Sequence, residues 1–320
     1  MSRFVVLLVV VAVLGCTRNI PVPDVKASAA EAHVARGRYL ANNAMSCVVC
    51  HSRRDWTKFG GPVVEGSEFG GSGDIPVVEG WTSKMHFGAQ NLTPQHLADW
   101  SDGEIVRATL LGQSKDTHGL FPYMPYRTWR DAVPLEDATD IVAYLRTLSP
   151  IAQDAPERDL PIPTFVLNRL PEPRELKASA PKPSDPGYGA YVTARARCVE
   201  CHTEDDRRGN YTAPLFSGGR EFAVPPPGKG FVRSSNLTPD PDTGLGGMTR
   251  EAFVARFKAM TLEAARASTV GDDGYNSVMA WWAYSGLTEE DLGAVFDYLK
   301  SLPPVKNNVE KWSLTSKEAK

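Results

Sequence analysis

Two short stretches of the chain carry cysteine and histidine in the same order. Cys47-Val48-Val49-Cys50-His51 lies in the first half of the 320 residues, and Cys198-Val199-Glu200-Cys201-His202 lies in the second half. On a helical turn, residues i, i+3 and i+4 share one face, so both sulfurs and the imidazole point toward one flat molecule. This is the attachment pattern of c-type haem, in which the thiols form thioethers and the histidine binds the iron. The sequence therefore predicts two c-type haems, covalently held by Cys47, Cys50, Cys198 and Cys201, with His51 and His202 as iron ligands.

Three other uses of such cysteines fit less well. A zinc ribbon places its two cysteine pairs about 15–20 residues apart, whereas these pairs lie in opposite halves of the chain. A thioredoxin-like redox pair does not require a histidine directly after its second cysteine, and structural disulfides do not need that histidine either.

The far side of each iron needs a sixth ligand if the haem is to transfer electrons without binding a substrate. Methionine sulfur is a soft ligand that raises the reduction potential. Met124, between Tyr123 and Pro125, and Met279 stand at matched positions before the tyrosines of the last helix in each half. We predict that these two methionines bind the irons. The rival ligands are Met85, Met248, Met260, His86, His96 and His118, and His118 is interpreted as a surface residue or one that supports a ligand.

Other segments recur in the same order as the cysteine motifs. Gly37-Arg38-Tyr39-Leu40 is matched by Gly189-Ala190-Tyr191-Val192, and Asn91-Leu92-Thr93-Pro94 by Asn236-Leu237-Thr238-Pro239. Each half then ends with apolar residues at helical spacing, over 135–148 and 287–302. The sequence thus predicts a mainly α fold made by tandem duplication.

Capping signals mark the starts of further helices. Ser101 and Glu104 form a capping box for a helix over 101–111, and Thr249 can cap a helix over 250–260. Thr288 with Asp291 resembles a capping box for the last helix. Asn91 and Asn236 either cap their turns or donate hydrogen bonds to haem propionates. Three roles are open for Arg53-Arg54 and Arg207-Arg208. They offset the charge of the haem propionates, attract an acidic partner, or form a solvated face.

Composition is that of a globular protein, with 42% hydrophobic and 23% charged residues. The formal net charge of −3 gives no basic footprint for nucleic acid, and neither a nucleophile motif nor a phosphate-binding glycine loop occurs. Prolines are enriched between the halves, since nine of the 25 lie over 150–186. We expect a signal peptide over 1–15, a tether over 16–30, domains over 31–150 and 187–305, a Pro-rich linker over 151–186, and a tail over 306–320.

The first residues are typical of an exported protein. Arg3 precedes an unbroken apolar run from Phe4 to Leu14, which is too short to span a membrane. Val13-Leu14-Gly15-Cys16 resembles a bacterial lipobox, which implies cleavage before Cys16 and its lipidation. The expected location is the periplasmic side of a membrane, and Thr17 after the cysteine favours the outer membrane by family analogy.

Both halves resemble class I cytochrome c domains. The match is to the multihaem cytochrome c subunits of bacterial membrane-bound alcohol and sugar-acid dehydrogenases. The residues that carry it are the two Cys-x-x-Cys-His motifs, Asn236-Leu237-Thr238-Pro239-Asp240, Asp242-Thr243-Gly244-Leu245-Gly246, Tyr123-Met124-Pro125-Tyr126 and Tyr298-Leu299-Lys300-Ser301-Leu302-Pro303-Pro304. This chain departs from the pattern of those subunits in two ways. Those subunits commonly carry three haem motifs, whereas this chain has two. Met279-Ala280 also stands where Met-Pro is expected.

The resemblance implies a dihaem cytochrome c that passes single electrons and has no catalytic activity of its own. Its partners would be a dehydrogenase or quinone complex as donor, and an oxidase or soluble cytochrome as acceptor. Two alternatives keep the same motifs: a dihaem peroxidase needs one five-coordinate iron, and a haem-based gas sensor needs one displaceable ligand.

Overall fold

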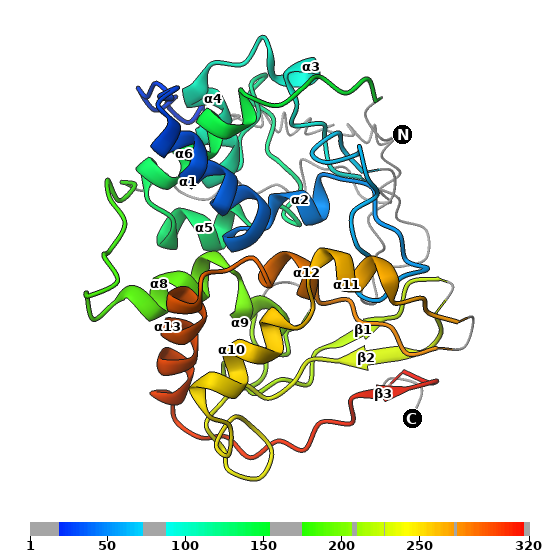
Figure 1. Ribbon diagram of the computed structural model, residues 1–320. Helices are drawn as coiled ribbons and strands as arrows, with labels where there is room; N and C mark the ends of the chain where they lie inside the picture. Colours follow the sequence, from blue (N-terminus) through cyan, green and yellow to red (C-terminus); the bar gives the residue numbers. More distant parts are fainter. Residues whose placement is uncertain are drawn as a thin grey trace, which may run out of the picture.

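Helices account for most of the secondary structure, and one small antiparallel sheet accompanies them (Figure 1). The computed structural model describes residues 19–72, 88–153, 175–206, 210–226, 228–271 and 274–316. The expected signal peptide and Cys16 lie outside the described residues, as do Met85, His86, Arg207-Arg208 and most of the Pro-rich linker. The mainly α prediction is confirmed.

The described residues of the first half form eight short helical elements, drawn in blue to green in Figure 1. A capping box starts α4, because the Ser101 hydroxyl accepts from the Glu104 amide at 3.2 Å and Glu104 accepts from the Ser101 amide at 2.7 Å. The helix predicted over 101–111 is real, but its second part is a π-helical turn. The elements are α1 (Glu31–Tyr39), η1 (Leu40–Ala44), α2 (Cys47–Cys50), α3 (Pro94–Leu97), α4 (Asp102–Val106), η2 (Arg107–Leu111), α5 (Tyr126–Ala132) and α6 (Leu135–Leu145).

In the second half, the part of the chain that the structure describes adds six helices and the sheet. Thr249 and Thr288 cap α10 and α13 as the sequence predicts, each accepting from a backbone amide three residues on. The helices are α8 (Tyr188–Arg195), α9 (Cys198–Cys201), α10 (Arg250–Lys258), α11 (Leu262–Ala267), α12 (Trp281–Tyr284) and α13 (Glu289–Lys300).

The sheet was not predicted. Strands β1 (Glu221–Ala223), β2 (Phe231–Arg233) and β3 (Trp312–Ser313) run antiparallel in the order β1-β2-β3, with Val232 opposite both Phe222 and Trp312. Strands of two or three residues are too short to show an alternating pattern in the sequence. The last strand lies in the stretch expected as a tail, so part of that stretch is ordered against the second half.

The recurring Gly-x-Tyr segments mark two helix crossings. A Cβ placed on Gly37 of α1 would lie 1.8 Å from the Asp140 carbonyl oxygen of α6, and one on Gly189 of α8 would lie 2.5 Å from the Ala294 carbonyl oxygen of α13. Only a residue without a side chain permits such close approach of two backbones. Therefore α1 packs directly on α6, and α8 packs directly on α13.

We expect Gly37→Ala to lower the free energy of unfolding by about 1–3 kcal/mol, the usual cost of forcing a methyl group into a filled contact. Gly247→Ala is the matched control, because a Cβ there meets no heavy atom within 4 Å. Chemical denaturation followed by circular dichroism compares both with the wild type. A Gly37→Ala protein as stable as the wild type would show that α1 and α6 do not touch this closely.

Two large apolar clusters fill most of the interior, and a third, smaller one of Phe222, Val224 and Val232 lies at the sheet. The larger one contains residues from both halves of the sequence, including Cys47 and Val48 beside Ala280, Trp282 and Leu292. The second large cluster lies in the second half around α8 and α13, and Cys198 and Val199 pack against it. Because the larger cluster crosses from one half to the other, the two halves share a core.

A buried polar network also joins the halves, and its contacts are reciprocal. Tyr39 of α1 donates to the carboxylate of Asp291 on α13, while Tyr191 of α8 donates to the carboxylate of Asp137 on α6. Arg195 pairs with Asp291 and is itself 0% exposed. Burial, followed by the bond to Asp291, raises the pKa of Tyr39 to about 12, so the phenol stays protonated at neutral pH.

The segments expected as tether and linker are partly packed. Ile20 is buried, and its amide donates to Gln113 Oε1 at 2.8 Å. After the linker residues that lie outside the described part, the Lys177 and Ala178 carbonyls accept from the Leu135 and Glu136 amides. The described residues of both segments therefore pack against the first half.

Candidate functional site

Each Cys-x-x-Cys-His motif forms one helical turn, α2 or α9. The residue before the first cysteine has a left-handed backbone, with φ of 48° at Ser46 and 60° at Arg197. In both turns the histidine amide donates to the carbonyl of the first cysteine, at 2.9 Å in the first and 3.0 Å in the second. The two cysteines and the histidine of each motif thus lie on one turn, as the sequence predicts.

The two histidines are oriented in the same way. His51 Nδ1 lies 2.7 Å from the Gln90 carbonyl oxygen, and His202 Nδ1 lies 2.7 Å from the Ser235 carbonyl oxygen. A carbonyl oxygen only accepts, so Nδ1 carries the proton and donates it, which leaves the Nε2 lone pair for a metal. Burial lowers the pKa of His51, and burial lowers that of His202 to about 4. Both rings are therefore neutral, as an iron ligand must be.

The chain after each histidine makes a matched turn. Phe69 and Phe216 both have left-handed backbones, with φ of 62° and 64°. The amide of Phe69 donates to the Ser52 hydroxyl at 2.9 Å, and that of Phe216 donates to the Thr203 hydroxyl at 3.0 Å. A left-handed conformation is costly for an aromatic residue, so these hydrogen bonds hold a strained turn in place.

Sequence reasoning missed this turn. The signal was present, because Phe69-Gly70-Gly71 and Phe216-Ser217-Gly218 repeat a Phe-x-Gly pattern. Gly71 and Gly218 donate to the carbonyls of His51 and His202, at 2.9 and 2.8 Å. The turn therefore fixes the backbone of each candidate iron ligand.

Asn91 and Asn236 organise the turns that present the carbonyls to the histidines. Asn91 accepts from Thr93 and donates to the Ile151 carbonyl at 2.7 Å; Asn236 accepts from Thr238 and donates to the Val305 carbonyl at 2.7 Å. Both side chains are buried. These contacts support the turn-capping interpretation.

The surroundings of the cysteines suit thiols that form thioethers with a haem. Burial raises the pKa of Cys47 and of Cys198 to about 12, so neither is a thiolate at neutral pH. None of the four cysteines that the structure describes forms a disulfide. A donor set of two thiols and one neutral imidazole on a single turn suits thioether attachment of a haem with histidine on its iron.

The two candidate methionines lie in different surroundings. Met124 is half-buried against the apolar cluster that contains Cys47. Met279 is half-buried too, and its backbone is held by Ser277, whose hydroxyl accepts from the Met279 amide at 3.2 Å. Their binding to iron stays a prediction.

The described rival ligands are placed as follows. The His118 side chain is 78% exposed and bonded to Asp116 at 2.7 Å, so it is a surface residue. Met248 packs against the cluster that Cys198 contacts, and Met260 against the one that contains Cys47. His96 lies on α3, with its ring 6.0 Å from that of Trp100.

Arg54 belongs to the loop after the first motif and is not part of a solvated face. Its guanidinium donates to the Gly60 carbonyl at 2.6 Å and to that of Gly61, and stacks 4.3 Å from the Trp56 ring centroid. Burial lowers its pKa to about 10. Arg54 closes the loop after the first motif, whereas its neighbour Arg53 is exposed.

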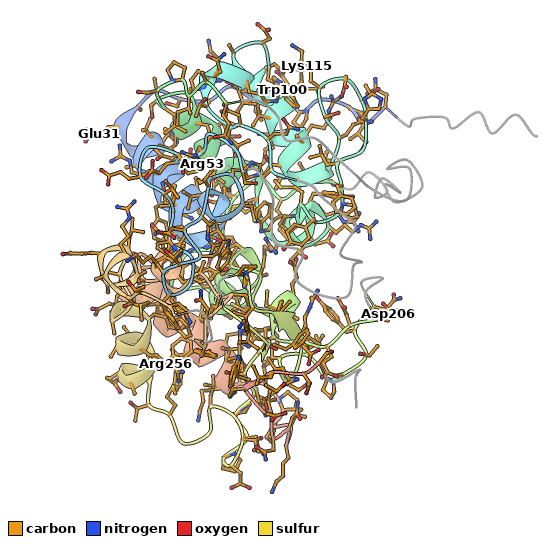
Figure 2. The ribbon with its side chains drawn as sticks, turned by 90° about the vertical axis from the view of Figure 1, so that its right-hand side faces the viewer. Glu31, Arg53, Trp100, Lys115, Asp206 and Arg256 are labelled. Atoms are coloured by element: carbon orange, nitrogen blue, oxygen red, sulfur yellow. The ribbon has the colours of Figure 1, made fainter. Side chains whose placement is uncertain are left out.

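Figure 2 shows Arg53 in the part of the molecule that also contains Glu31, Trp100 and Lys115, with Asp206 and Arg256 in the other part.

Two further findings concern only the described residues. They contain no group of three or more His, Cys, Asp or Glu side chains placed to hold a metal ion. No helix among them has the length and apolar character needed to cross a membrane.

The fold is mainly helical, and a backbone carbonyl holds the histidine of each Cys-x-x-Cys-His turn. This arrangement is compatible with the cytochrome c class. The chain is similar to the cytochrome c subunit of alcohol dehydrogenase (quinone) from Gluconacetobacter polyoxogenes, at 27% identity over 85% of this chain and 56% of that protein. It is also similar to the fructose dehydrogenase cytochrome subunit of Gluconobacter japonicus, at 26% over 88% and 55%, and to the gluconate 2-dehydrogenase cytochrome c subunit of Pantoea cypripedii, at 25% over 85% and 60%. The resemblance to dehydrogenase cytochrome c subunits is thereby confirmed.

The chain spans only a little over half the length of these relatives. No protein-family model matches it.

Proposed function

We propose that this chain is a dihaem c-type cytochrome that passes single electrons for a dehydrogenase. The main support is the matched hydrogen bond at 2.7 Å from Nδ1 of His51 and of His202 to a backbone carbonyl. A histidine held in this way presents Nε2 in a fixed direction, which is what an iron ligand needs. The similarity to dehydrogenase cytochrome c subunits supports the same assignment.

Each residue has a defined role in the proposal. Cys47 and Cys50 tether the first haem and Cys198 and Cys201 the second, while His51 and His202 bind the irons. Met124 and Met279 would be the second protein ligands of the irons. The haem would supply a one-electron redox centre. The apolar clusters beside Cys47 and Cys198 would limit the access of water to it and thereby raise its reduction potential.

The proposal includes a tandem organisation, with cytochrome c domains over 31–150 and 187–305 joined by a Pro-rich linker over 151–186. The matched histidine bonds, the matched phenylalanine turns and the paired glycine crossings support a duplication. Since the large apolar cluster spans both halves, the two domains would act as one rigid body.

The proposed setting is the periplasmic side of a membrane. Residues 1–15 would serve as a signal peptide and Cys16 as the lipidated residue, with the outer membrane favoured by Thr17. The donor would be a dehydrogenase or quinone complex, and the acceptor an oxidase or a soluble cytochrome. In each relative named above the cytochrome subunit serves a dehydrogenase, which favours that donor.

The alternatives, a dihaem peroxidase and a gas sensor, both need an iron with an open or displaceable position. Met124 and Met279 are half-buried residues at matched positions in the two halves, and this favours two irons that each have a methionine ligand. Turnover of peroxide with a cytochrome donor, or carbon monoxide binding to the resting reduced protein, would favour an alternative.

Spectroscopy of methionine variants tests the ligand assignment. We expect Met124→Ala and Met279→Ala each to abolish one of two methionine–iron charge-transfer bands in the oxidised protein and to lower one of two reduction potentials. Met248→Ala is the control and should keep both bands. The assignment is wrong if neither substitution changes a haem, or if Met248→Ala removes a band.

A further inference from the structure

We propose that the loop after the first Cys-x-x-Cys-His turn, residues 54–61, positions Met279 and thereby sets the strength of methionine ligation at the second haem. We name this segment the Gly60 loop. The inference rests on the proposed function, because that function assigns Met279 to the second iron. It goes further in making the first half of the chain responsible for a ligand of the haem in the second half.

The backbone of Gly60 is hydrogen-bonded on both sides of Met279. Its amide donates to the Asn276 side-chain oxygen at 2.8 Å, three residues before the methionine. Its carbonyl accepts from the Trp282 indole at 3.1 Å, three residues after the methionine. Asn276 is 0% exposed and Trp282 is 6% exposed, so both hydrogen bonds lie in the interior. The Gly60 loop thus holds the segment over 276–282 at both of its ends.

Asn276 connects this contact to Met279 itself. Its side-chain amide donates to the carbonyls of Trp56 and Lys58, at 3.1 and 3.3 Å, and both residues belong to the Gly60 loop. Its oxygen also accepts from the Ser277 amide at 2.8 Å, and the Ser277 hydroxyl accepts from the Met279 amide at 3.2 Å. A short chain of hydrogen bonds therefore runs from the first half to the backbone of Met279.

Further hydrogen bonds hold the Gly60 loop against the second half. The Phe59 amide donates to the Ser268 carbonyl at 2.8 Å, and the Val270 amide donates to the Thr57 carbonyl at 2.8 Å. Figure 1 shows the blue chain after α2 running toward α11, the helix that ends just before this contact. The backbone of the loop is therefore fixed by the same half of the chain that carries Met279.

The two halves differ in the residue that follows the methionine. Met124 is followed by Pro125, whose ring fixes one backbone angle. Met279 is followed by Ala280, which imposes no such restraint. In the second half the hydrogen bonds to Gly60 supply the restraint instead. Changes in the Gly60 loop should therefore weaken the ligation by Met279 and leave that by Met124 unaffected.

Gly60→Ala tests the inference from the first half. Gly60 has φ of 70°, and a Cβ placed on it would lie 3.3 Å from the Met279 carbonyl oxygen, closer than ordinary contact. The methyl group therefore presses on the backbone of Met279. Imidazole is a good ligand for iron and competes with methionine for it. We expect about tenfold less imidazole to remove one methionine–iron charge-transfer band, which corresponds to about 1.4 kcal/mol of weaker ligation. That band should be the one that Met279→Ala abolishes.

Trp282→Phe is a milder variant, which keeps an aromatic ring and removes the indole donor. The Gly60 carbonyl keeps its hydrogen bond from Arg54 at 2.6 Å, so no buried acceptor is left without a donor. We expect about fivefold less imidazole to remove the same band, which corresponds to the loss of about 1 kcal/mol from one hydrogen bond. Amide hydrogen exchange of the peptide covering 276–282 is a second readout, and it should be faster in both variants.

Gly66→Ala is the matched control for backbone strain. Gly66 has φ of 76°, and a Cβ there meets no heavy atom within 4 Å. Thr269→Val is the control for loop contact, because it removes an exposed hydrogen bond of 2.8 Å from Lys58 Nζ at the same junction. Both control proteins should respond to imidazole as the wild type does.

The inference is overturned if Gly60→Ala and Trp282→Phe respond to imidazole as the wild type does, or if Gly66→Ala changes the response as much as Gly60→Ala. An equal change in the band of Met124 would also overturn it, since that would indicate general loosening of the protein. These outcomes leave the proposed function intact. A Met279→Ala protein that keeps both bands refutes the ligand assignment in the proposed function, and the inference with it.

Discussion

Replacing Asp291 with alanine should lower the free energy of unfolding by about 3–5 kcal/mol, the usual cost of leaving a buried charge without its partner. Arg195 is fully buried and pairs with Asp291. The phenols of Tyr39 and Tyr188 donate to the same carboxylate and would lose their acceptor. Urea denaturation followed by circular dichroism measures the change.

Asp297→Ala is the matched control on the same helix. The Asp297 side chain is 63% exposed and lies 3.5 Å from Arg250, so its loss should cost no more than about 0.5 kcal/mol. If Asp291→Ala were as stable as Asp297→Ala, the polar network between the halves would contribute little to the fold.

The double variant Cys198→Ala/Cys201→Ala should contain half the covalent haem of the wild type, because each pair of thiols forms the thioethers of one haem. The haem left on Cys47 and Cys50 should keep its own charge-transfer band, since Met124 and His51 are untouched. Haem per chain is measured by absorbance of the pyridine complex against total protein.

Val199→Ala provides the control, as it changes a residue between the two cysteines without removing a thiol. It should retain both haems. A double variant with an undiminished haem content would show that the second motif does not attach haem.

The sequence was most informative where the interactions are local. Ser101, Thr249 and Thr288 were predicted as caps and do cap their helices, because a cap bonds to amides within three residues. The helical turn of each Cys-x-x-Cys-His motif could be predicted for the same reason, because one turn sets the spacing of its cysteines and histidine.

Features that depend on distant parts of the chain could not be predicted in this way. The bond from Tyr39 to Asp291 joins residues from opposite halves, and no pattern near either residue indicates it. Within the second half, no pattern in the sequence indicates the bond between Tyr284 and Ala196 or the pairing of β3 with β2. The left-handed Phe69 and Phe216 were missed for another reason, since an aromatic residue seldom adopts that backbone conformation.

Intact-mass spectrometry of the purified mature protein tests the central claim most directly. After acid–acetone treatment, which removes haem that is not covalently bound, we predict a mass equal to the chain plus two haems, with one attached to the peptide of Cys47 and Cys50 and one to the peptide of Cys198 and Cys201. A mass showing one haem, or a colourless chain, would contradict the account.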